Sequence, residues 1–391
     1  MKGGTLNLSH ATFSNNLAGG TDSGVRYGGG AYLYFGGGMQ ANIVDSTFSG
    51  NTAVEQGGGM VAKAYLGTTV TFQRTTISGN TAGKMGGGFY GYAYDPNTVV
   101  RFVDSTISGN TSDEGGGGLA LVITDPNANF ELTNSTVTQN RSDADMSNDY
   151  GGGGVYLDNS NLGPLVVSGS VIAGNSDGSM NAFNDIEQKT VGLQVYDSLI
   201  GDNAGTVFAE AQAPDADNNL IGSAGGGGII DPQLRALADN GGFTQTHMPM
   251  PGSPLIDHYD GCSGDDQRGV PRGVDADAVP GNDCDIGAAE KLASDDAIFA
   301  DGFEQPPILL TFSKRSAELS RDSILPLLST RHRGQPVTVA RATSPGVDAF
   351  AVIKARHGTD GVELQIQRFD GHDWIIGRWQ PLTGDSVELR W

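Results

Sequence analysis

The feature that most constrains the fold is a motif that recurs about every 30 residues. Asp45 to Thr52 reads DSTFSGNT, and related copies begin at Arg74, Asp104 and Asn134. Each copy contains an asparagine, and the asparagines that align are Asn16, Asn51, Asn80, Asn110, Asn140, Asn175 and Asn203. A fixed period of this size indicates an array of stacked repeats, in which each unit packs only against its neighbours.

The pattern inside one repeat predicts strands. Apolar residues stand ten, eight and three positions before each asparagine; for Asn80 they are Val70, Phe72 and Ile77. Spacing of two with β-branched and aromatic residues is typical of strands. A glycine run such as Gly57–Gly59 precedes a further apolar strand in the first five repeats. Roughly three short strands per repeat predict an all-β fold, a right-handed parallel β-helix (a pectin-lyase-like solenoid) of about seven coils over residues 1–230.

The rest of the chain divides into three parts. Residues 231–292 are rich in Pro, Gly and Asp, which stop strand pairing, and we expect a cap closed by a Cys262–Cys284 disulfide. Such a disulfide implies an oxidising compartment. Residues 293–307 are expected to be a linker. Residues 308–391 alternate apolar and polar residues, predicting a small antiparallel β-sandwich or barrel with a hairpin around Asp370-Gly371.

Charge and hydropathy limit the classes of molecule that the chain is expected to bind. The net charge of −22 disfavours nucleic acid and anionic membrane surfaces as partners. No apolar run is long enough to predict a transmembrane helix. No signal peptide precedes the first predicted strand, so we expect the chain to be the tail of a longer gene product or to have a mis-called start. We expect a secreted or bacterial cell-surface monomer.

Several segments after the repeats resemble a known family. They are DPQLRALADNGGFTQTH (Asp231 to His247), PGSPLID (Pro251 to Asp257), DQRGVPR (Asp266 to Arg272) and CDIGAAE (Cys284 to Glu290). In this order they resemble the end region of choice-of-anchor Q domain proteins, which are secreted right-handed β-helix proteins of bacteria. The GGG and F/I-S-G-N repeats also resemble those of polymorphic outer membrane proteins. The resemblance implies a surface or secreted β-helix with no defined enzyme activity.

Three groups of residues are candidate sites. Asp45, Arg74 and Asp104 share a corner of successive repeats and are the candidate catalytic residues. Hydroxyl pairs beside the asparagines, together with two tyrosines of a loop, are the candidate ligand-binding residues: Thr47, Ser49, Thr76, Ser78, Thr106, Ser108, Tyr92 and Tyr94. A calcium site, the one cofactor that the sequence suggests, would use Asp265, Asp266, Asp275, Asp277 and Asp283.

These patterns favour a structural or adhesin-like protein that binds an extracellular glycan, or a host or cell surface, without turnover. The alternative is a polysaccharide lyase or glycoside hydrolase, for which basic residues such as Lys63 and Lys189 are candidate bases. However, no repeat column gathers a base with several acids beyond Asp45, Arg74 and Asp104. A minor alternative is an ice-binding protein, in which the hydroxyl pairs would form a flat exposed strip.

Overall fold

A computed structural model describes two compact units, Met1–Leu292 and Ala293–Trp391. Within the first unit it describes residues 4–20, 26–146, 150–159, 163–179, 182–190, 192–273 and 284–292. Residue 295 and the strands of the second unit are also described, the latter by their backbone. Asp275, Asp277 and Asp283 lie outside the described residues, so the calcium site proposed for them stays a prediction.

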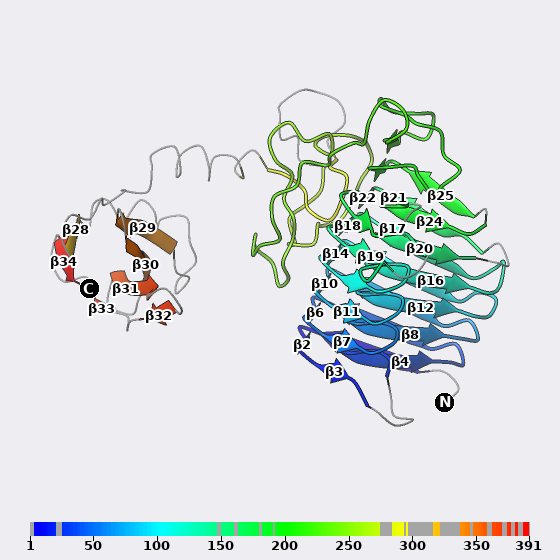
Figure 1. Ribbon diagram of the computed structural model, residues 1–391, viewed down its shortest axis with the longest axis horizontal. Helices are drawn as coiled ribbons and strands as arrows, with labels where there is room; N and C mark the ends of the chain where they lie inside the picture. Colours follow the sequence, from blue (N-terminus) through cyan, green and yellow to red (C-terminus); the bar gives the residue numbers. More distant parts are fainter. Residues whose placement is uncertain are drawn as a thin grey trace. The chain divides into compact units, whose positions relative to one another are not determined.

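The first unit is a right-handed parallel β-helix built from four parallel sheets (Figure 1). Sheet A contains β1 (Thr5–Ser9), β5 (Gln40–Val44), β9 (Thr69–Gln73), β13 (Val99–Val103), β17 (Asn129–Thr133), β21 (Leu165–Ser168) and β25 (Leu193–Tyr196). Sheet B contains β2 (Thr12–Ser14), β6 (Thr47–Ser49), β10 (Thr76–Ser78), β14 (Thr106–Ser108), β18 (Thr136–Thr138), β22 (Val171–Ile172), β26 (Leu199–Ile200) and β27 (Leu220–Ile221).

The other two sheets complete each coil. Sheet C contains β3 (Leu17–Ala18), β7 (Thr52–Ala53), β11 (Thr81–Ala82), β15 (Thr111–Ser112), β19 (Arg141–Ser142) and β23 (Ser176–Asp177). Sheet D contains β4 (Ala31–Phe35), β8 (Met60–Ala64), β12 (Phe89–Ala93), β16 (Leu119–Ile123), β20 (Val155–Asp158) and β24 (Ile186–Gln188). The predicted fold class is confirmed, but a coil holds four strands rather than three. The strands of sheet C were missed because two residues are too few to show an alternating pattern.

The core lies inside the coils and repeats along them. Side chains of equal type stack on one another, as Phe72 does on Phe102 with ring centroids 4.7 Å apart. Ile77 and Ile107 are fully buried at the equivalent position of sheet B. The predicted apolar positions are therefore the core positions, because in-register stacking brings each one against its own copy in the next coil.

A ladder of buried asparagines runs beside the core. The backbone N–H and the side-chain Nδ2 of Asn80 both donate to Oδ1 of Asn110, at 3.0 and 2.9 Å. The second amide hydrogen of Asn80 is directed to the carbonyl of Phe48 at 3.0 Å. The same pattern links Asn51, Asn80, Asn110, Asn140 and Asn175. The asparagine column therefore has a structural role, since every amide bonds to the neighbouring coil.

The glycine run allows the turn before sheet D to pass close to the ladder. Gly57 has a positive φ of 69°, which favours glycine. A Cβ on Gly58 would lie 2.4 Å from the carbonyl oxygens of Thr81 and Gly87. A Cβ on Gly59 would lie 2.9 Å from Nδ2 of Asn80. The run is therefore required by backbone conformation and by close approach, and larger residues cannot replace it without moving the backbone.

The ladder ends at an aspartate rather than at Asn203. Oδ1 of Asp185 accepts from Nδ2 of Asn175 at 2.9 Å, and its Oδ2 accepts from the N–H of Asp202 at 2.8 Å. Asn203 instead donates to the carbonyl of Phe208. Asp185 is buried, and this burial raises its pKa to about 7.

This pKa predicts that the protein loses stability as the pH rises. An unfolded aspartate titrates near 3.8, so between about pH 4 and pH 7 folded Asp185 holds a proton that the unfolded chain has released. The free energy of unfolding should therefore fall across this range. In thermal denaturation between pH 4 and pH 8, the stability of Asp185→Asn should decrease less with rising pH than that of the unmodified protein. Some fall should remain, because burial also raises the pKa of Asp285 to about 7. An equally steep fall in the variant would contradict the assignment.

The segment after the coils packs along the outer face of sheet B. We call residues 232–273 and 284–292 the cover segment. At the upper coils, its Leu255 and Ile286 pack against Val171 and Leu199. At lower coils the contacts are polar, and Oγ1 of Thr76 donates to the carbonyl of Gln245 at 2.6 Å. The predicted cap is therefore a lateral cover, because the outer face of sheet B offers both apolar and hydroxyl partners.

The second unit contains antiparallel strands, as its alternating sequence predicts. Strands β28 (Ser316–Ser320) and β34 (Ser386–Arg390) pair with each other. A second sheet joins β29 (Val337–Ser344), β30 (Val347–His357), β31 (Val362–Phe369), β32 (Trp374–Ile376) and β33 (Gln380–Pro381). Phe369 of β31 pairs with Trp374 of β32, which confirms the predicted strand pairing around Asp370-Gly371.

Candidate functional site

The structure divides the three predicted catalytic residues between two ion pairs. Arg74 forms a bidentate ion pair with Asp45, with its Nε and Nη2 donating at 2.7 and 3.0 Å. Asp104 instead accepts from Nη2 of Arg272 in the cover segment at 2.9 Å. All three corner residues adopt the left-handed backbone conformation, which turns the chain from sheet A to sheet B. The corner therefore holds two ion pairs with different partners and not one catalytic cluster.

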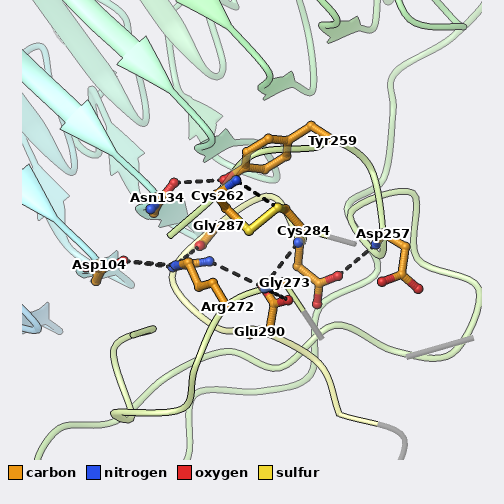
Figure 2. Close-up of a disulfide and its surroundings, with 11 residues drawn as sticks. Asp104, Asn134, Asp257, Tyr259, Cys262, Arg272, Gly273, Cys284, Gly287 and Glu290 are labelled. Carbon is orange, nitrogen blue, oxygen red and sulfur yellow. Dashed lines mark hydrogen bonds and ion pairs between the residues drawn. A yellow bond between two sulfur atoms is a disulfide. The ribbon is translucent and has the colours of Figure 1, made fainter. Parts of the chain in front are cut away.

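Figure 2 shows how Arg272 joins the coils to the cover segment. Its buried guanidinium lies between Asp104 and Glu290 and also donates to the carbonyl of Gly287 at 2.9 Å. Burial raises the pKa of Asp104, whereas the charge of Arg272 opposes this shift. Asp104 thus has a structural partner, and its carboxylate is engaged by Arg272.

The hydroxyl pairs are largely covered rather than exposed. Thr76, Ser78, Thr106 and Ser108 are buried beneath the cover segment. Oγ1 of Thr106 donates to Oε1 of Gln267 at 2.6 Å, and Oγ of Ser108 lies 2.7 Å from Nε2 of His247. The prediction of an exposed ligand-binding strip is wrong at these four positions, because the strip is the docking surface for the chain's own cover. Thr47 and Ser49 are half-buried. The ice-binding alternative loses the flat exposed array on which it rested.

The predicted disulfide is present and shapes one end of a cavity. Cys262 and Cys284 are bonded, with Cα atoms 5.9 Å apart. The loop of Cys262 faces the corner residues across a cavity of about 550 Å³, lined among others by Arg74, Asp104 and Asp265. Tyr259 contacts the corner through a hydrogen bond to Oδ1 of Asn134 at 3.0 Å.

The described part of the predicted calcium site does not gather free carboxylates. Both oxygens of Asp266 are used within the cover segment: they accept from the backbone N–H groups of Arg268, Val270 and Glu290, and from Nε of Arg268. Asp265 lies at the rim of the cavity. Among the described residues, no group of three His, Cys, Asp or Glu side chains lies close enough together to hold a metal ion.

The outer face of sheet D concentrates tyrosine. Nine of the eleven tyrosines of the chain lie on this face or at its edges: Tyr27, Tyr32, Tyr34, Tyr65, Tyr90, Tyr92, Tyr94, Tyr150 and Tyr156. We call this set the tyrosine face. Tyr90 and Tyr156 pack with Val61 and Ala120 in a cluster that is distinct from the inner core. Glycine allows this packing, since a Cβ on Gly115 would lie 2.7 Å from the ring of Tyr156.

The predicted ligand residues Tyr92 and Tyr94 belong to this face. The rings of Tyr34, Tyr65 and Tyr94 form a stacked row, with centroids 5.0 and 5.1 Å apart. Tyr34 is 64 % exposed and Tyr94 is 49 % exposed, so their edges and hydroxyl groups are open to solvent. The row follows the axis of the β-helix, because each ring comes from the next coil.

A lysine stands in the middle of the tyrosines. Lys63 of β8 is in register with Tyr34 of β4 and Tyr92 of β12. Its Nζ lies 5.5, 5.8 and 6.0 Å from the ring centroids of Tyr92, Tyr32 and Tyr27. Distances of this size fit cation–π contacts, which stabilise an ammonium that is partly withdrawn from water.

A network of charges borders the same face. Glu55 pairs with Nη1 of Arg26 at 3.3 Å and with Nζ of Lys84 at 3.4 Å. A hydrogen bond from Tyr27 lowers the pKa of Glu55 and raises that of Tyr27. Aromatic rings, hydroxyl groups and fixed charges therefore share one open surface, an arrangement suited to a polar ligand with ring faces.

The sequence contained a signal for this face. Tyr32 and Tyr34, like Tyr90 and Tyr92, are two residues apart in a strand and must therefore point to the same side. The choice of side, and the placement of Lys63 between the two pairs, needed the register of the coils. No family model, curated protein or solved structure matches this chain. Its predicted kinship with choice-of-anchor Q domain proteins accordingly stays a prediction.

Proposed function

We propose that this chain is a secreted or bacterial cell-surface protein that binds an extracellular glycan without cleaving it, and that the tyrosine face is the binding surface. The observation that carries this proposal is the gathering of nine of eleven tyrosines on the outside of sheet D. Sugar rings pack their C–H faces against aromatic rings, while their hydroxyl groups bond to phenols and carboxylates. A glycan lying along the β-helix axis would meet one coil after another.

The disulfide and the absence of a membrane-crossing helix among the described residues are compatible with this location. Disulfides persist in oxidising surroundings outside the cytoplasm. The degradative alternative is less well supported, because Asp45 and Asp104 are each engaged by a different arginine. A lyase or hydrolase would need an available acid or base beside the bound sugar.

Exchanging exposed tyrosines for alanine should weaken glycan retention. Tyr34→Ala and Tyr94→Ala should each raise the dissociation constant for a retained glycan about tenfold, since exposed tyrosines are frequent energetic centres of binding surfaces. Tyr196→Ala is the matched control, because Tyr196 is 42 % exposed but belongs to sheet A. The fold should tolerate all three changes, because each of these tyrosines is 42 to 64 % exposed and lies outside the buried core.

The assay should record binding and turnover in the same tubes. The purified protein is incubated with plant and bacterial polysaccharides, with and without calcium, and pull-down, reducing ends and ultraviolet absorbance from unsaturated products are followed. We expect retention without new ends or absorbance. New reducing ends would show that the protein cleaves the glycan and would contradict the proposal. An equal loss of glycan affinity in all three variants would show that the tyrosine face is not the binding site.

A further inference from the structure

Three basic side chains lie along the first three coils of the tyrosine face. Arg26 and Lys84 both contact the carboxylate of Glu55, and Lys63 lies over the ring of Tyr27, which hydrogen-bonds to Glu55. Glu114 also acts on Lys84, whereas Lys63 has no ion pair among the described residues. The chain as a whole carries a net charge of −22, so this location is the reverse of the general trend. A positive site on an acidic protein attracts anions selectively, because the surrounding surface repels them.

Lys63 is the member of this group that is free to bind. Within the described residues its ammonium has no ion pair and no hydrogen-bond acceptor, whereas Arg26 and Lys84 both contact Glu55. A lysine ammonium carries three N–H donors on a compact charge. The tyrosine rings hold this ammonium in place but accept none of its hydrogen bonds in the usual geometry. Lys63 is only half-buried, so its donors can reach a ligand.

The position of Lys63 fits a ring-shaped ligand with an acidic substituent. Its register partners Tyr34 and Tyr92 lie on the preceding and following coils. A chain of sugars along the β-helix axis would therefore meet tyrosine on both sides of the ammonium. The turn that leads into the next coil is acidic: Glu114 stacks on Lys84 through a backbone hydrogen bond, and burial and the charges of Asp145 and Asp143 raise the pKa of the adjacent Asp113. This difference gives the face one end that favours anionic groups and another that disfavours them.

We infer that the tyrosine face takes an acidic polysaccharide and that Lys63 binds its carboxylate or sulfate groups. This inference rests on the proposed glycan binding and names the class of glycan. Arg26 and Lys84 add to the attraction, while their ion pairs with Glu55 keep them at the edge of the site. The neighbouring tyrosines contact the sugar rings, and Lys63 distinguishes charged from neutral chains.

The test compares matched polymers that differ only in their charge. Alginate and its carboxyl-reduced form make one pair, and a sulfated galactan and its desulfated form make the other. We expect the protein to bind at least one acidic polymer about tenfold more tightly than its neutral counterpart, with an affinity that falls as salt is added. The pair that shows the difference identifies whether carboxylate or sulfate is the preferred group.

Variants separate the role of Lys63 from a general effect of charge. Lys63→Met should remove the preference for the acidic polymer and keep the binding of the neutral one, and Lys63→Arg should retain most of the preference. Arg101→Gln changes the net charge equally but lies on sheet A, in an ion pair with Glu131, and should behave as the unmodified protein. Thermal denaturation confirms that each variant is folded.

The possible results distinguish this inference from the proposed function. Equal binding of both members of each pair, or an unchanged preference in Lys63→Met, would overturn the role of Lys63 and leave glycan binding intact. A failure to retain any polysaccharide, acidic or neutral, would overturn both proposals.

Discussion

Replacing Asn80 with alanine should lower the free energy of unfolding by roughly 2–6 kcal/mol. The change removes the acceptor of two donors of Asn51, its backbone N–H and one hydrogen of its side-chain amide. Both groups are buried, and each buried polar group left without a partner costs about 1–3 kcal/mol. The ladder would also be interrupted in the middle of the stack, where neighbouring coils cannot move apart without losing their own hydrogen bonds.

Asn42→Ala is the matched control for this experiment. Asn42 also forms an asparagine–asparagine contact with the adjacent coil, since its Nδ2 donates to Oδ1 of Asn7 at 2.9 Å. This contact is exposed, so water can replace it, and the expected change is within about 0.5 kcal/mol. Urea-induced unfolding followed by circular dichroism measures both values. A similar decrease in the free energy of unfolding for the two variants would show that burial is not the reason why the ladder stabilises the fold.

Exchanging Arg272 for methionine should detach the cover segment and destabilise the fold by about 3–5 kcal/mol. The guanidinium is fully buried between Asp104 and Glu290, and its removal leaves two buried carboxylates without their cation. These acids can then be accommodated only by taking up protons. The loss should therefore be larger at pH 8 than at pH 4, where protonation neutralises them.

Hydrogen exchange gives the more specific measurement for Arg272→Met. Amides of the cover segment, such as those of Gly287 and Ala288, bond to the coils and should lose protection. Amides inside sheets A and D should change less. Arg101→Met is the control, because Arg101 and Glu131 form a partly exposed pair that contributes about 0–1 kcal/mol. Unchanged protection of the cover in Arg272→Met would refute the role of this arginine as the connection between the two parts.

The tyrosine and lysine variants address a separate property of the molecule. The asparagine ladder and the Arg272 contacts decide whether the β-helix and its cover are stable. Within the tyrosine face, the buried Tyr90 and Tyr156 form a packed cluster with Val61 and Ala120, and Tyr27 and Tyr92 pack against it. Its exposed members are therefore suitable for changing binding while the fold is retained.

The sequence by itself determined the features that repeat with the coil. The strand positions, the core residues and the asparagine ladder follow from one period, because each residue in a regular solenoid meets its own copy 28 to 35 residues away. The ion pair of Asp45 and Arg74 follows the same repeat, because these residues lie 29 positions apart. The sequence also marked Tyr92 and Tyr94 as candidate ligand-binding residues but supplied no neighbours for them.

Only the tertiary structure decided which faces of the coils are open. The sequence pattern does not distinguish the hydroxyl strip of sheet B from the outer face of sheet D. In the structure, the cover segment buries the hydroxyl strip, whereas several tyrosines on the outer face of sheet D remain exposed. Arg272 contacts Asp104, which lies 168 positions earlier in the chain, and this contact is not part of the repeat. Contacts between distant segments of this kind depend on how a non-repeating chain folds back. The residues that make such contacts therefore show no periodic pattern in the sequence. Contacts between stacked coils do show one, because equivalent residues recur once in every coil.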